Sequence, residues 1–215
     1  MMQRVEQFRT GGDRNFGYLA ADPRSREAFI VAPSYSPEGI VRAAFEAGYR
    51  IRYSFSTHGH PDHICGNDDI RRLRGFEPLL FGSTCPDSGI KVEDGARFPL
   101  GNGSFTLIHT PGPTLDSICI LFGDALFTGD TLFVGKVSGT STDAEAITPY
   151  NALHQKLMTL LPATRVWPGH DYGVRPLSNI GTECASNPVL MQPNFIVFLD
   201  LKQNWAAYKR EHGIV

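Results

Sequence analysis

The length, composition and charge of this chain exclude several classes of protein. Its 215 residues are enough to bury one sizeable core, and we expect a single domain over residues 1–215. The 41% hydrophobic and 20% charged residues are ordinary for a soluble globular protein, and a formal net charge of −2 gives no reason to expect nucleic acid as a partner. The 22 glycines and 15 prolines favour a sheet-rich fold with many turns over a helical bundle.

The N-terminus and the cysteines favour a cytoplasmic protein. Residues 1–12 are polar and lack the features of a secretory signal. No apolar run approaches the roughly 20 residues that a membrane helix needs, so no membrane partner is expected. The four cysteines are irregularly spaced without a Cys-x-x-Cys pair, which predicts reduced thiols. We expect Cys65 to be a small buried side chain rather than a ligand or a nucleophile.

The first third of the chain predicts short strands around one helix. Residues 16–21 and 27–32 are mostly apolar runs separated by a proline turn, which predicts two strands. A serine-proline pair and a glycine are typical of the two ends of a helix over 36–48. Residues 51–55 alternate apolar and polar side chains as a strand does. They lead directly into the histidine-rich segment 57–63, which is therefore expected on the loop after a strand.

Beyond this segment, the pattern predicts further strands, two hairpins and three helices. In chain order, these are a helix at 67–73, a strand at 79–81, hairpins of 97–100 with 104–109 and of 118–122 with 125–128, a helix from 143, a strand at 165–167 and a helix at 195–211. The helix from 143 has a predicted apolar stripe of Leu153, Leu157, Leu160 and Leu161. This order places Asp130 and His170 just after strands.

The segment Thr57-His58-Gly59-His60-Pro61-Asp62-His63 has the clearest chemical pattern. It contains three of only seven histidines, and no histidine precedes them. Two imidazoles two residues apart on a turning loop can bind one cation, while Asp62 and His63 can point toward a second. Imidazole nitrogen and carboxylate oxygen are good ligands for zinc and similar metals. A solvated polar loop is the alternative, but ligand-type residues clustered on a loop favour two adjacent metal sites.

The motifs of this chain resemble those of the metallo-β-lactamase fold family. Residues 57–63 are similar to the family's His-x-His-x-Asp-His signature, and the similarity continues in order through Thr110-Pro111-Gly112, Thr128-Gly129-Asp130 and Pro168-Gly169-His170-Asp171-Tyr172. The resemblance implies an α/β (α+β) fold, a four-layer α/β/β/α sandwich with metals at one edge of its two sheets. Residues 129–133 and 168–172 are most similar to the glyoxalase II-like (hydroxyacylglutathione hydrolase-like) branch.

The resemblance also implies a set of metal ligands. It assigns His58 and His60 to a first site, Asp62, His63 and His170 to a second site, and Asp130 to a bridge between them. The implied cofactor is one or two Zn²⁺ ions, with iron or manganese as alternatives. Without the resemblance, Asp130 could equally be a turn residue, and His170 would be little better supported.

One position departs from the family pattern. The family has Thr-Pro-Gly-His-Thr after the central hairpin, whereas this chain has Pro113 in place of the histidine, and proline offers no lone pair to a metal. His109 is a weak candidate to replace it, because its side chain is expected to end a strand in another direction. The first site would then keep two histidines and the shared Asp130, while the second would keep its full set.

The resemblance implies hydrolysis of a thioester or related ester by a metal-bound hydroxide. Asp62 is the best candidate to orient the water or to accept its proton. One alternative is an iron-dependent persulfide dioxygenase-like enzyme, but the positions that match its ligand triad are His58, Pro113 and Asp130. Another is a metal-binding homologue with catalysis impaired by Pro113. No Gly-x-Ser-x-Gly segment occurs, which disfavours a serine hydrolase.

The expected partners are a small-molecule substrate and, as an option, a second copy of the chain in a homodimer. Lys136, Tyr172 and Arg175 lie near motif loops and could contact an anionic substrate, although solvated surface roles are favoured over this one. Glyoxalase II binds glutathione largely through a C-terminal helical region. Here only a helical tail from about residue 178 follows the last motif, so a true hydroxyacylglutathione hydrolase is not expected.

Overall fold

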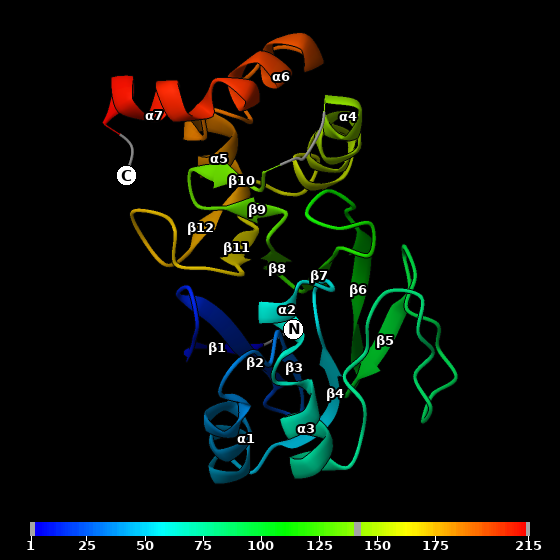
Figure 1. The fold of residues 1–215 in the computed structure, drawn as a ribbon. Coiled ribbons are helices and arrows are strands. Elements are labelled where there is room, and N and C mark those ends of the chain that lie inside the picture. Colours follow the sequence, from blue (N-terminus) through cyan, green and yellow to red (C-terminus); the bar gives the residue numbers. More distant parts are fainter. Residues whose placement is uncertain (1–2, 140–142, 214–215) are drawn as a thin grey trace.

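In the computed structural model, which describes residues 3–139 and 143–213, two β-sheets lie between two layers of helices (Figure 1). The first sheet has the order β1-β2-β3-β4. Its strands are β1 (Arg4–Gly11), β2 (Asn15–Asp22), β3 (Glu27–Val31) and β4 (Arg50–Phe55). The first three strands are antiparallel, and helix α1 (Pro37–Glu46) connects β3 to the parallel strand β4.

The second sheet has six strands in the order β12-β11-β8-β7-β6-β5. Its strands are β5 (Arg97–Leu100), β6 (Gly103–His109), β7 (Ile118–Phe122), β8 (Ala125–Gly129), β11 (Arg165–Pro168) and β12 (Ser178–Asn179). A separate ribbon pairs β9 (Leu132–Phe133) with β10 (Lys136–Val137). Within this sheet β8 and β11 are parallel neighbours, so their C-terminal ends meet at one edge.

An aromatic core joins the two sheets. Phe29 of β3 stacks on Phe105 of β6 with ring centroids 4.1 Å apart, and Tyr18 of β2 meets Phe127 of β8 at 5.1 Å. All four rings are almost fully buried. Such contacts between the inner faces remove much apolar surface from water and fix how the sheets face each other.

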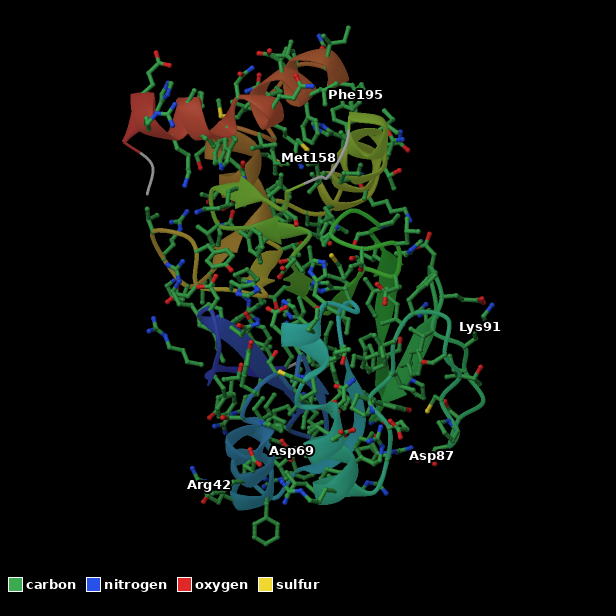
Figure 2. All side chains as sticks on the ribbon, viewed as in Figure 1. Arg42, Asp69, Asp87, Lys91, Met158 and Phe195 are labelled. Atoms are coloured by element: carbon green, nitrogen blue, oxygen red, sulfur yellow. The ribbon has the colours of Figure 1, made fainter. Side chains whose placement is uncertain are left out.

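Helices cover the two outer faces. On the first sheet, Ile40 of α1 and Ile70 of α3 (Asn67–Arg74) pack against the outward side chains of the strands. The second sheet is covered by α4 (Asp143–Asn151), the π-helix η1 (Ala152–Leu157), α5 (Ile180–Ser186), α6 (Phe195–Gln203) and α7 (Trp205–His212). Figure 2 shows Met158 and Phe195 in this helical layer, where both contact the core. The predicted four-layer sandwich is confirmed.

Several predicted elements differ from those of the structure. The polar N-terminal segment, for which no element was predicted, forms β1 at the edge of the first sheet, where half-exposed side chains suit its polar composition. The strand predicted at 79–81 is reduced to one bridge between Phe55 and Leu79. The single helix predicted at 195–211 is two helices, because Asn204 ends α6 and Trp205 begins α7.

Two side chains predicted to be buried are exposed. Leu161 is 78% exposed, because η1 ends at Leu157 and the predicted stripe does not continue beyond it. Cys65 is also exposed at the end of the short helix α2 (Pro61–Ile64), so its prediction as a buried side chain was wrong. None of the four cysteines forms a disulfide in the described part of the chain. Among the described residues, no helix has the length and apolar character needed to cross a membrane.

Candidate metal centre

The six candidate ligands meet where β4, β8 and β11 end. His58 and His60 follow β4, and the turn after them continues directly into α2, which contains Asp62 and His63. The bridging candidate, Asp130, follows β8, and His170 follows β11. The histidine-rich segment is thus only partly a loop, because Asp62 and His63 lie on a helical turn begun by Pro61.

The second site is a tight and buried group. Nε2 of His63 lies 3.1 Å from Nε2 of His170 and 3.5 Å from Oδ2 of Asp62. The distance from His170 Nε2 to the same Asp62 oxygen is 3.4 Å. Both histidines are almost fully buried, whereas the Asp62 side chain is 31% exposed. These three ligand atoms all lie within 4.8 Å of one another, which is compatible with binding one ion.

Asp130 lies between the two sites and presents a different oxygen to each. Its Oδ1 is 3.2 Å from His63 Nε2 and 3.4 Å from His170 Nε2, while its Oδ2 is 3.8 Å from His58 Nε2. The atoms of His58, His63 and Asp130 form another group within 4.8 Å. This arrangement is compatible with the bridging role that the sequence implied.

The first site is looser. Nδ1 of His60 lies 2.9 Å from Nε2 of His58, but His60 belongs to neither compact group of the described residues. His109 is not in these groups either. Its Nε2 lies 2.8 Å from the carbonyl oxygen of Leu115, and its ring stacks on Phe81 at 3.9 Å. His109 therefore has other partners, and the structure gives it no role in replacing the missing histidine.

The cluster fits a divalent metal. Asp130 Oδ1 is buried, and neither of its short contacts to histidine has the geometry of a hydrogen bond. A buried carboxylate oxygen without a donor is costly unless a cation balances it. Gly169 also leaves space here, since a Cβ at this position would lie 2.4 Å from Asp130 Oδ1. Imidazole nitrogens and carboxylate oxygens together suit zinc or iron.

Burial and charge set the protonation of the cluster. Burial, followed by the neighbouring His63, lowers the pKa of His58 to about 3, so this ring is neutral and has a free lone pair near pH 7. Burial alone would raise the pKa of Asp130, but the adjacent His170 and His63 outweigh it and hold that pKa far below its usual range. His58 thus presents a neutral imidazole and Asp130 an ionised carboxylate, which are forms that bind metals.

Three supporting residues were missed by the sequence analysis. The side-chain amide of Asn15 donates to Asp62 Oδ2 at 2.8 Å, and the carbonyl oxygen of Asp13 lies 2.8 Å from His170 Nδ1. Asp116 accepts a 3.3 Å hydrogen bond from the backbone N–H of Gly59, between the first two histidines. The Gly-Gly-Asp-Arg-Asn sequence indicates only a turn, so nothing in it could have placed Asp13 and Asn15 beside ligands some distance along the chain.

A cationic pocket adjoins the second site. The ring of Tyr172 stacks on His170 at 4.5 Å, and Tyr172 also lines a cavity of about 590 Å³. Arg14, Lys136 and Lys209 line the same cavity. Arg175 does not, and its guanidinium reaches Ser178 Oγ at 3.5 Å. The structure therefore places two of the three predicted anion contacts, Lys136 and Tyr172, around one cavity next to the cluster.

Comparison with known proteins identifies the family. The family sequence model of the metallo-beta-lactamase superfamily matches residues 79–170 of this chain. The chain is 31% identical over 210 residues to the hydroxyacylglutathione hydrolase of Thermosynechococcus vestitus, covering 93% of this chain and 81% of that protein. It is 30% identical over 181 residues to the mitochondrial persulfide dioxygenase ETHE1 of Homo sapiens, covering 81% of this chain and 71% of that protein.

A solved structure agrees with this assignment. The crystal structure of ETHE1 from Myxococcus xanthus superposes with a TM-score of 0.83 at 28% identity, covering 95% of this chain and 91% of the other. With these relatives and the four-layer fold, the chain belongs to the metallo-beta-lactamase superfamily. The two named relatives are a hydrolase and a dioxygenase, so membership alone leaves the reaction open.

Proposed function

We propose that this protein is a metal-dependent hydrolase of thioesters or related esters. The observation that carries the proposal is the compact group formed by Asp62, His63 and His170, with Asp130 Oδ1 within 3.4 Å of both imidazoles. It offers four protein ligands without any contribution from the position of Pro113. The similarity to a hydroxyacylglutathione hydrolase supports hydrolysis of a thioester.

The chain supplies the binding and proton-handling groups of this reaction. Zn²⁺ ions held by the cluster would lower the pKa of a water from 15.7 to about 7 and stabilise negative charge on the substrate carbonyl oxygen. His63 and His170 provide buried ligands that hold their positions. Asp62 is the more exposed carboxylate, and its Oδ2 faces the cluster, so it is placed to orient the water and accept its proton.

The cationic pocket supports an anionic substrate. Lys136 and Arg14 both face the Tyr172 ring, with the Lys136 ammonium 5.7 Å and the Arg14 guanidinium 4.8 Å from its centroid. Burial, followed by the positive charges of Lys209 and Arg14, lowers the pKa of Lys136, which indicates a locally positive field. A carboxylate on the thiol portion of the substrate would be attracted there while its carbonyl reached the cluster.

The proposal is tested by metal analysis and by hydrolysis assays on the same sample. We expect protein purified without added metal to contain one to two zinc ions per chain and to hydrolyse anionic acyl thioesters. Chelator treatment should abolish hydrolysis, and added Zn²⁺ should restore it. Metal-free active protein, or a metal-loaded protein inactive on a broad panel of thioesters and esters, would contradict the proposal.

An iron-dependent persulfide dioxygenase is the second candidate, favoured by the similarity to the human and Myxococcus xanthus proteins. Pro113 weighs against it, because one of the three positions expected to hold iron has no donor atom. Oxygen consumption by iron-loaded protein with glutathione persulfide distinguishes the two reactions. We expect no consumption above the metal-free control; rapid, iron-dependent consumption would favour the dioxygenase.

A further inference from the structure

Residues where β1 turns into β2 form hydrogen bonds to two candidate ligands of the second site, Asp62 and His170. Asn15 Nδ2 donates to Asp62 Oδ2 at 2.8 Å, and two residues earlier the Asp13 carbonyl oxygen lies 2.8 Å from His170 Nδ1. Asn15 is completely buried. The β1–β2 turn and the first residue of β2 thus contact an α2 side chain and the histidine after β11.

These two contacts determine how the ligand atoms are aimed. A carbonyl oxygen can only accept, so His170 must donate from Nδ1, which leaves its Nε2 lone pair toward His63. The Asp62 oxygen that accepts from Asn15 is the same one that lies 3.5 Å and 3.4 Å from His63 and His170. Asn15 therefore holds the carboxylate in the rotamer that faces the cluster.

The turn itself is fastened to the segment that carries His170. The backbone N–H of Phe16 donates to the Gly169 carbonyl at 2.8 Å, and the N–H of Asp171 donates to the Arg14 carbonyl at 3.0 Å. The Tyr172 hydroxyl donates to Asp13 Oδ2 at 2.6 Å. Arg14 has a φ of 60°, a left-handed conformation that non-glycine residues rarely adopt without compensating contacts.

The hydrogen bond that the side-chain amide of Asn15 donates goes to Asp62. Within the described part of the chain, its Oδ1 has no hydrogen-bond partner although it is buried, while its Nδ2 makes the 2.8 Å bond to the carboxylate. A buried, half-satisfied amide costs stability. The cost is explained if the donated hydrogen bond serves the ligand rather than the fold.

We propose that Asn15 is a positioning residue for the second metal site, which fixes the Asp62 carboxylate toward His63 and His170. The inference rests on the proposed function, because it takes the second site to be a metal site. Asn15 touches neither metal nor substrate and acts through Asp62. Hydrogen-bonded partners of metal ligands commonly contribute 10- to 100-fold to affinity, about the effect expected here.

The test compares Asn15 with a second buried asparagine. Asn187 is also completely buried, and its Nδ2 donates to a carboxylate oxygen of Glu183 at 3.0 Å, which belongs to neither ligand group. We would prepare N15A and N15L together with N187A and N187L. The leucine variants fill the space of the amide, so that loss of the donor is separated from loss of packing. Metal-stripped proteins would be titrated with Zn²⁺ against a chromophoric chelator, and with Co²⁺ by visible absorption.

For both Asn15 variants we expect one zinc dissociation constant to rise about 10- to 100-fold, while a second constant, where the parent protein has one, changes less than about threefold. The Co²⁺ absorption should change in position or intensity. The Asn187 variants should lose a comparable amount of thermal stability with unchanged constants and spectra. If the Asn15 variants behave like the Asn187 variants, or if both constants rise equally, the inference is wrong. Parent protein that binds no metal would overturn the proposed function as well.

Discussion

The two candidate metal sites share Asp130 but differ in how their other ligands are held. In the second site, Asp62 has a hydrogen-bond partner in Asn15 at the start of β2, His170 has one in Asp13 of the turn before it, and both His63 and His170 are almost fully buried. In the first site, His60 lies outside the compact groups, and Pro113 occupies the position where the family has a histidine. The contrast teaches that a ligand can be lost on one side of a shared carboxylate while the supporting contacts on the other side remain complete.

The largest effect is expected at the residue common to both sites. D130A removes the carboxylate whose two oxygens face His58 and His63, so both metal equivalents should be lost and hydrolysis should fall by about 1000-fold or more. Elemental analysis and thioester assays measure this. D124A is the matched control, because Asp124 lies in the turn of the same hairpin but pairs with Arg165. Retention of two metals in D130A would show that Asp130 is not a bridge.

A direct comparison of the sites comes from H170A and H60A. We expect H170A to lower kcat by about 100-fold or more and H60A by about 10-fold or less, because the second site is the complete one. Rates and metal content are measured on the same preparations. Equal losses in the two variants would remove the distinction between the sites, and a larger loss in H60A would reverse it.

The difference in metal binding between the two sites should become smaller in P113H. A histidine at this position adds a donor to the loop that Asp116 connects to Gly59, so the affinity of the weaker zinc equivalent should rise about tenfold. Hydrolysis should rise only about threefold to tenfold, since in the proposed function the second site has all its ligands without this position. A gain of several orders of magnitude from a near-zero start would instead indicate a homologue whose catalysis had been lost through Pro113.

A smaller effect is expected in the cationic pocket beside the second site. K136M should lower kcat/KM for an anionic thioester by about tenfold and leave a neutral thioester unchanged, because one ionic contact is worth on the order of 1.4 kcal/mol. K91M, a surface change at a lysine paired with Glu93, is the control. Equal losses on both substrates would assign Lys136 a structural role.

The smallest effect tests whether stability and metal binding are separable. The Gly101 N–H, together with Arg50 and Arg52, lowers the pKa of Glu27 from 4.5 to about 2. A depressed carboxyl pKa stabilises the fold above pH 4.5, and that contribution is lost as pH falls toward 2. E27Q should therefore cost about 1–2 kcal/mol at pH 7 and less at pH 3, as measured by urea unfolding, with metal content unchanged. A parallel loss of zinc would show that the stability of the first sheet and metal binding at the site are linked.

Strand alternation and hairpin glycines are local signals, and they predicted most of the strands, whereas the four-layer sandwich followed from the family resemblance. The strands near Phe29 and Phe127 and the hairpin that ends at Asp130 follow from such patterns. The meeting of Asp130 and His170 required the family resemblance, since their closeness arises from the parallel pairing of β8 and β11. Asn15 was missed because its contact with Asp62 joins residues 47 positions apart, and no local pattern reports that.

The position of Asn15 near the start of the chain has a consequence for biosynthesis. Asn15 leaves the ribosome first, Asp62 follows, and His170 emerges only after most of the protein has been made. A nascent chain that ends before residue 170 lacks one ligand of the second site, however well its first sheet has folded. Under the proposed function, full-affinity metal capture is therefore a late event, and it would report that the first and last thirds of the chain have come together.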